Sequence, residues 1–253
     1  EGADLNIWKK TNSISEDLKN QMDKIKETFC FLFVGHWLQG EVGHDRKDIS
    51  SLIDTFIKTF KDNPSSTRPA LILKTSSATF SILDRNDMLA RINKRMRQSG
   101  VKNPPKIYLI HGDLKPSELN ELYNHPKVKA HVSFTKGEGF GRPLLEATLS
   151  EKPVIASNWS GHIDFLKHSQ LLPGNLQEIH KSCVWDKVLV KGSRWFYVNH
   201  LYAQKVLKDV FKNYKQYLPE AKTQAKFSAT QFSLAKMKED FVKILEKNII
   251  SEV

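Results

Sequence analysis

The chain has 253 residues, 40% of them hydrophobic, and carries 39 lysines and arginines against 28 aspartates and glutamates. A chain of this length buries a sizeable core, and we expect one domain with embellished ends. Its longest apolar stretches, such as residues 29–34, are far too short to cross a bilayer. These features exclude a membrane-spanning helix and predict a cytoplasmic protein, either free or peripheral on the cytoplasmic face of a membrane.

The formal net charge of +11 invites phosphate-bearing partners, but the excess is spread along the chain and not gathered in a tail. The densest basic group places Arg91, Lys94 and Arg95 on one face of a predicted helix. A solvated surface accounts for such a face, and no aromatic residues are interleaved with it as in nucleic-acid modules. We therefore do not expect nucleic acid as the partner. Cys30 and Cys183 lie in apolar neighbourhoods, so we expect reduced core residues.

Short apolar runs rich in β-formers alternate along the chain with longer helical patterns. The expected strands are 29–34, 70–75, 106–110, 129–134 and 153–157, and the helices that follow them are 48–60, 84–99, 116–125, 142–150 and 161–168. Strand and helix pairs in succession imply a parallel sheet covered on both faces. The predicted fold class is α/β, a doubly wound parallel sheet. From residue 199 onward the pattern is helical only, which predicts extra carboxyl-terminal helices.

A glycine-rich stretch, "FTKGEGFGRPLLEA" at 134–147, follows the fourth expected strand. Ligands of such sheets bind in the loops at the carboxyl ends of the strands. Gly139 and Gly141 let the backbone approach a ligand closely, and Pro143 suits the first position of a helix. The unpaired amides over 139–142 then point outward as an anion site, which suits a phosphate.

Two glutamates, Glu138 and Glu146, flank these glycines. Carboxylates accept hydrogen bonds from vicinal hydroxyls, as an acidic residue does with ribose in dinucleotide folds. Taken singly, Glu146 also fits a first-turn glutamate that favours the helix dipole, and Glu138 fits an exposed loop acid. Together with the phosphate site, the pair points to a sugar nucleotide.

The usual nucleotide fingerprints are missing. The glycines run G-x-G-x-G and not G-x-G-x-x-G, since position 142 is arginine. The earlier loop "GHWLQGEVGHDRKD" lacks the Lys-Ser or Lys-Thr ending of a Walker motif. Dinucleotide binding and P-loop ATPase chemistry are therefore not expected.

The stretch "EGFGRPLLEATLSEKPVIASNWSG" resembles the E-x7-E signature of the retaining glycosyltransferases of the GT-B fold, the large family four. "LFVGHWLQGEVGHDRKDISSLIDTF" is similar to the first strand, glycine loop and basic pair of that family's donor domain, and "IHGDLKPSELNELY" to the stretch before its nucleobase pocket. The similarity covers about residues 29–168, in order. It implies a Rossmann-like half of a GT-B fold.

The resemblance also implies roles for individual residues. Glu138 would touch the hydroxyls of the donor sugar, and Glu146 those of the ribose. Arg46 and Lys47 would stabilise the departing diphosphate, and both cations suit phosphate oxygens. With Arg46, Lys47 and Glu138 as the catalytic group, the implied donor-binding residues are Gly35, Leu114, Gly139, Phe140, Gly141, Arg142, Pro143 and Glu146.

As a family member, the chain would transfer sugar from a nucleoside-diphosphate sugar to a hydroxyl with retention of configuration. No cofactor and no metal are expected, and the acceptor is an unknown glycan, lipid or protein. The resemblance implies an interdomain linker and leading helix at 1–28, a nucleotide-sugar-binding domain at 29–198 and packed helices at 199–253. An amino-terminal acceptor domain would complete the enzyme. Two alternatives stay open: a sugar-nucleotide-binding module without catalysis, and a DNA-glucosylating protein.

Some residues depart from the family pattern. Lys136 is expected to add a positive charge near the donor sugar, next to Phe134 and Thr135. His36 and His44 lie in the glycine loop and are expected as surface or packing residues.

Overall fold

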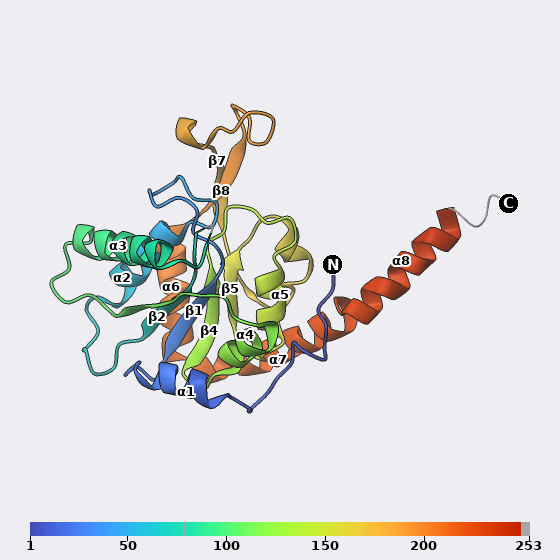
Figure 1. The fold of residues 1–253 in the computed structure, drawn as a ribbon, viewed down its shortest axis with the longest axis horizontal. Coiled ribbons are helices and arrows are strands. Elements are labelled where there is room, and N and C mark those ends of the chain that lie inside the picture. The colour runs from blue at the N-terminus through green and yellow to red at the C-terminus, as the bar shows by residue number, and fades with distance from the viewer. Residues whose placement is uncertain (78, 249–253) are drawn as a thin grey trace.

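A parallel sheet of six strands forms the centre of the chain, which the computed structural model describes over residues 1–77 and 79–248 (Figure 1). The strands are β1 Cys30–Val34, β2 Ala70–Lys74, β3 Ile107–Ile110, β4 Val128–Ser133, β5 Val154–Ser157 and β6 Gln170–Leu172. They lie in the order β3-β2-β1-β4-β5-β6, and every neighbouring pair is parallel. This order reverses beside β1, as in doubly wound sheets. The predicted α/β class is confirmed.

Helices cover both faces of the sheet (Figure 1). They include α1 Glu16–Asp23, α2 Ile49–Phe60, α3 Ile82–Gln98, α4 Pro116–Asn124, α5 Arg142–Thr148 and α6 His200–Lys212. Successive strand residues point to opposite sides, so each strand supplies both faces. In β1, Phe31 and Phe33 pack with α2, α3 and α6. Cys30 and Leu32 pack with α1, α4 and α5, so two apolar cores enclose the sheet.

Helix α2 shows how the sequence pattern becomes packing. Its apolar residues recur with a period near 3.6, which puts them on one face. That face lies wholly in the core: Ile49, Leu52, Ile53, Phe56 and Ile57 are all fully buried. The loop before α2 carries the predicted basic pair, Arg46 and Lys47. The buried face of α2 therefore fixes the end of the loop at which that pair lies.

Three parts of the fold differ from the sequence prediction. The strand β6, Gln170–Leu172, was not among the five expected strands. The expected helix at 161–168 is only the 3₁₀ turn η1, Gly161–Asp164. The strands β7 Gly174–Glu178 and β8 Arg194–Val198 form an unpredicted antiparallel hairpin above the sheet, with the 3₁₀ turn η2 Lys181–Cys183 between them (Figure 1). Four of the five β7 residues are exposed, so β7 has no apolar pattern to reveal it.

The carboxyl-terminal helices are α6, α7 Tyr214–Gln231 and α8 Leu234–Asn248. Helix α7 lies against α5, and Thr148 Oγ1 donates to Ser228 Oγ at 2.8 Å. Helix α8 extends away from the sheet (Figure 1), which leaves Phe241 58% exposed. Over residues 1–77 and 79–248 we find no helix with the length and apolar character of a membrane span. Cys30 and Cys183 are both free and buried, as expected.

Candidate functional site

A cavity of about 690 Å³ opens at the carboxyl ends of β1, β2 and β3. These are the ends at which ligands of doubly wound sheets bind. The predicted site residues that line it are Gly35, Arg46, Lys47, Leu114, Arg142 and Pro143. The sheet therefore brings the glycine loop, the basic pair and the start of α5 to one place.

Glu138 holds the basic pair at this cavity. Lys47 Nζ lies 2.5 Å from Glu138 Oε1, and Arg46 Nη1 lies 3.0 Å from Glu138 Oε2. Thr135 Oγ1 donates to Glu138 Oε1 at 2.7 Å. Burial favours the neutral acid, but Lys47 and then Arg46 outweigh it and hold the pKa of Glu138 below its usual value. The carboxylate is thus ionised and fully engaged, beside the cavity lining.

The backbone around Glu138 is fixed by the next loop of the sheet. Glu138 N–H donates to Ser160 Oγ at 2.8 Å, and Gly161 N–H donates to Glu138 O at 3.1 Å. A Cβ atom on Gly161 would lie 2.0 Å from the carbonyl oxygen of Gly139. Only glycine at position 161 permits this close approach of two loops.

Gly141 begins helix α5 in a left-handed conformation, with φ of 95°. A Cβ atom there would lie 2.9 Å from the Cβ atom of His162, so both conformation and space favour glycine. Helix α5 has only seven residues, which limits the positive potential that its dipole supplies. The anion site expected at its first amides therefore depends on the side chains nearby.

Those side chains make the cavity lining positive. Its charged lining residues are Arg46, Lys47, Lys74 and Arg142 against Asp45 and Asp113, an excess of cations. Lys74 was not predicted as a site residue, although a charged residue at the end of an apolar strand is a usable sign. Lys74 Nζ donates to the carbonyl of Gly112 at 2.7 Å. Burial lowers the pKa of Lys74, and Asp113 opposes this.

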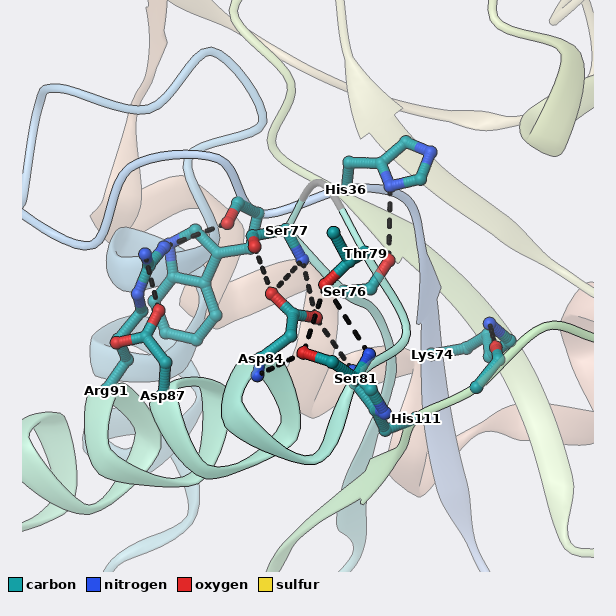
Figure 2. A network of polar contacts seen from close by, with 12 residues as sticks. His36, Lys74, Ser76, Ser77, Thr79, Ser81, Asp84, Asp87, Arg91 and His111 are labelled. Carbon is teal, nitrogen blue, oxygen red and sulfur yellow. Dashed lines mark hydrogen bonds and ion pairs between the residues drawn. The ribbon is translucent and has the colours of Figure 1, made fainter.

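A polar network holds the segment that brings Ser76 and Ser77 to the cavity lining (Figure 2). Asp84 accepts from Ser77 N–H at 3.1 Å and lies 2.7 Å from His111 Nε2, which joins the start of α3 to the end of β3. Ser76 Oγ lies 3.3 Å from His36 Nδ1. His36, expected as a surface or packing residue, is exposed and lines the cavity with Ser76 and Ser77.

Glu146 lies outside the lining of the large cavity. It borders a smaller one of about 290 Å³ beside residues 1–4, and Arg142 lines both cavities. Arg142 Nε lies 3.4 Å from Glu146 Oε1. Burial raises the pKa of Glu146 to about 7, and Arg142 opposes that rise. The Arg142 side chain thus connects Glu146 to the predicted anion site.

Gly139 and Phe140 also lie outside that lining. A Cβ atom on Gly139 would meet no atom within 4 Å, so its surroundings are open. The Phe140 ring packs on Phe165, with the centroids 5.1 Å apart. Phe140 therefore anchors the loop to the core.

Lys136 does not point toward the cavity, so the expected charge near a donor sugar is wrong. Its side chain is fully buried, with Nζ 3.3 Å from Asp48 Oδ1 and donating to the carbonyl of Gly43 at 3.0 Å. The ammonium also lies 5.0 Å and 4.5 Å from the ring centroids of Trp195 and Tyr197. The carboxylate and aromatic faces hold this cation inside the protein.

The basic face of α3 is paired with carboxylates. Two of its cations make contacts of 2.6 to 2.7 Å, and the third makes a two-point contact. The pairs are Arg91–Asp87, Lys94–Glu41 and Arg95–Asp54. These contacts reduce the charge that the face offers to an external polyanion.

Residues 52–182 match the family model described as glycosyl transferases group 1, which covers just over half of the chain. The chain belongs to this family. Within this group 1 glycosyltransferase chain, the matched segment contains Glu138 and Glu146, and it begins after Arg46 and Lys47. Comparison with curated proteins finds no match for the sequence.

Solved structures share the fold at low sequence identity. HepE of Anabaena, in complex with UDP and glucose, is 15% identical with a TM-score of 0.63, covering 97% of this chain and 55% of that one. The carboxyl-terminal domain of LpcC, a group 1 glycosyl transferase of Francisella tularensis, is 15% identical with a TM-score of 0.62. The match covers 92% of this chain and 100% of that domain. Sucrose-phosphate synthase of Thermosynechococcus elongatus is 14% identical with a TM-score of 0.65. The match covers 99% of this chain and 52% of the synthase.

These comparisons place the sheet and its helices among the carboxyl-terminal domains of GT-B glycosyltransferases. The group 1 glycosyltransferase chain spans about half the length of HepE and of the synthase. It spans the whole length of the LpcC domain.

Proposed function

We propose that this chain is the donor-binding half of a retaining glycosyltransferase and that the 690 Å³ cavity holds a nucleoside-diphosphate sugar. The observation that carries the proposal is the cluster of Arg46, Lys47 and Glu138 beside that cavity. A carboxylate with both oxygens engaged keeps two cations in place before any ligand arrives. Such preorganised charge is what an anionic leaving group requires.

The diphosphate binds near Arg46, Lys47 and Arg142 in this proposal. Negative charge grows on it as the bond from the sugar C1 to the phosphate oxygen breaks. Lys47 is mostly buried, so its attraction for that charge is little weakened by solvent. The cations thus stabilise the transition state more than the ground state, which is the condition for catalysis.

Retention follows if the acceptor hydroxyl attacks C1 from the face that the diphosphate leaves. A new C1–O bond forms, the old one breaks, and the hydroxyl proton passes to an oxygen of the departing phosphate. No protein nucleophile is needed. The geometry of Glu138 supports this, because a carboxylate held by Lys47, Arg46 and Thr135 is poorly placed to attack carbon.

The same cations are proposed to replace a metal ion. Among the described residues, no group of three or more histidine, cysteine, aspartate or glutamate side chains could hold one. UDP is the first nucleotide to test, because HepE was solved with UDP and glucose. The acceptor is proposed to bind between this chain and an amino-terminal domain, as the half-length match to HepE suggests.

Calorimetric titration with UDP, GDP, ADP and UDP-glucose in the presence of a chelator tests the proposal. We expect one nucleoside diphosphate to bind, with UDP-glucose binding too where that nucleotide is UDP, because the cation cluster needs no metal to attract a diphosphate. Inorganic diphosphate alone serves as the control for simple charge attraction. Binding that requires magnesium or manganese would reject the metal-free claim, and equal binding of all four compounds and diphosphate would reject a nucleotide site.

The same titrations test whether Glu146 accepts hydrogen bonds from the ribose. We expect Glu146→Gln to weaken UDP and UDP-glucose alike, by about 1 to 3 kcal/mol. The raised pKa of about 7 adds a pH signature: affinity for UDP-glucose rises as Glu146 ionises through that pKa, and the glutamine variant lacks this rise. An unchanged affinity in the variant would leave Glu146 as a structural residue of α5.

A further inference from the structure

A third cavity, of about 400 Å³, lies between the β7–β8 hairpin and the loop of residues 35–47. We call it the apolar groove. Leu38 from the loop faces Val184, Trp185 and Val188 from the hairpin, and these side chains are 62%, 42%, 69% and 65% exposed. Large apolar side chains gathered at one exposed place mark an interaction site more often than scattered ones do.

The apolar groove continues into the large cavity. Leu38, Asp45 and Arg46 line both. The Arg46 guanidinium, which contacts Glu138, therefore stands at the junction between them. A ligand in the groove would lie beside the group that we assign to the leaving diphosphate.

The two walls of the groove are fastened to each other. Ser182 Oγ lies 3.1 Å from His44 Nδ1, and Cys183 Sγ donates to the carbonyl of His44 at 3.4 Å. Deeper in, buried Lys136 joins the loop at Gly43 to the Tyr197 ring of β8. These contacts make the groove preformed, which reduces the ordering entropy that a ligand must overcome.

The lining decides which chemistry fits. Leu38, Val184, Val188 and Leu189 offer no hydrogen bonds, so the part of the groove that they line favours an aliphatic chain over a sugar or phosphate. The polar lining residues are Gln39, His44, Asp45 and Arg46 of the loop and Ser182 of the hairpin, and they suit the polar end of an amphiphile. Buried Cys183 and Trp195 make the surface concave, which suits a chain more than a flat bilayer. We propose that the apolar groove binds the aliphatic part of an amphiphilic acceptor, whose hydroxyl end then reaches the cavity past Arg46. The identification of the ligand as the acceptor rests on the proposed function, whereas its aliphatic character rests on the groove alone.

Titration with methyl, butyl, hexyl and octyl β-glucosides, each below its micelle concentration, tests the proposal. We expect affinity to rise about three- to fourfold for each methylene that the groove buries. The indole N–H resonances of Trp185 and Trp195 should shift in NMR spectra, while that of Trp8, which packs on Tyr123, should not. Equal affinity of the methyl and octyl compounds would overturn the proposal.

A matched pair of variants locates the binding. Val188→Asp places a charge in the groove wall, and Leu201→Asp places one at a 72% exposed position on α6 outside the groove. We expect Val188→Asp to weaken the octyl compound about tenfold or more, since a carboxylate strongly disfavours an apolar ligand. Leu201→Asp should bind it as the unchanged protein does, and both variants should bind UDP normally.

Three further outcomes are decisive. Equal octyl affinity in Val188→Asp and in the unchanged protein would overturn the groove assignment. Salt-sensitive sedimentation with anionic lipid vesicles that Val188→Asp abolishes would reassign this surface to a bilayer and overturn it too. Absence of UDP binding alongside intact, Val188-dependent octyl binding would overturn the proposed function while upholding the ligand class of the groove.

Discussion

Gly161→Ala is expected to lower the free energy of unfolding by about 3 kcal/mol or more, because overpacking against backbone cannot relax as it can against a side chain. The added Cβ atom would lie 2.0 Å from the Gly139 carbonyl oxygen and 2.8 Å from its carbon. The two loops must then separate, which breaks the hydrogen bond from Gly161 N–H to Glu138 O. Urea denaturation followed by circular dichroism measures the loss.

The control for this prediction is Gly139→Ala, in the same loop. A Cβ atom there meets no atom within 4 Å. We expect a change in stability of less than about 1 kcal/mol, as for a substitution that touches nothing. Equal stability of the two alanine variants would show that the loops can separate freely, and the account of the Glu138 backbone would then be wrong.

Lys47→Met is expected to weaken UDP binding by about 1.5 to 3 kcal/mol, which is the usual contribution of a hydrogen bond to a charged group. Methionine keeps much of the length of the side chain and removes the ammonium. Glu138 would keep Arg46 and Thr135 as partners, so the fold should survive. Calorimetry with UDP gives the affinity, and a thermal melt confirms that the variant is folded.

Lys94→Met is the matched control. Lys94 lies on α3 and pairs with Glu41 at the surface, so the variant removes the same charge away from Glu138. Its UDP affinity should equal that of the unchanged protein once the salt concentration is fixed. If both lysine variants bind UDP equally well, overall net charge and not the cluster at Glu138 attracts the ligand. The leaving-group role of Lys47 would then fail.

The sequence predicted the sheet well because local periodicity reports burial. Strand β1 and helix α2 follow directly from their apolar spacing, and parallel pairing follows from the alternation. The hairpin was not predicted because the β7 side chains are mostly exposed. The helix expected at 161–168 was wrong because η1 is too short to show a helical period. Short strands and exposed strands carry no periodic pattern to detect.

The site was predictable in outline for a different reason. The carboxyl ends of parallel strands share one edge, so the loop of Lys47 and the loop of Glu138 had to meet there. Which atoms meet could not be predicted, since Lys47 and Glu138 are 91 residues apart. The inward turn of Lys136 was equally hidden, because it depends on Trp195 and Tyr197 of the unpredicted hairpin.

Hydrogen exchange with and without UDP-glucose, in the presence of a chelator, tests whether the large cavity binds the sugar donor. Bound ligand should slow exchange in the segments that line the cavity or hold its cations, while α7, remote from the lining, serves as the internal reference. The segments are 35–47, 74–77, 112–114 and 137–143. We expect protection in these four segments together. Protection that is absent from them, or that appears only elsewhere in the chain, would contradict a donor site in the large cavity.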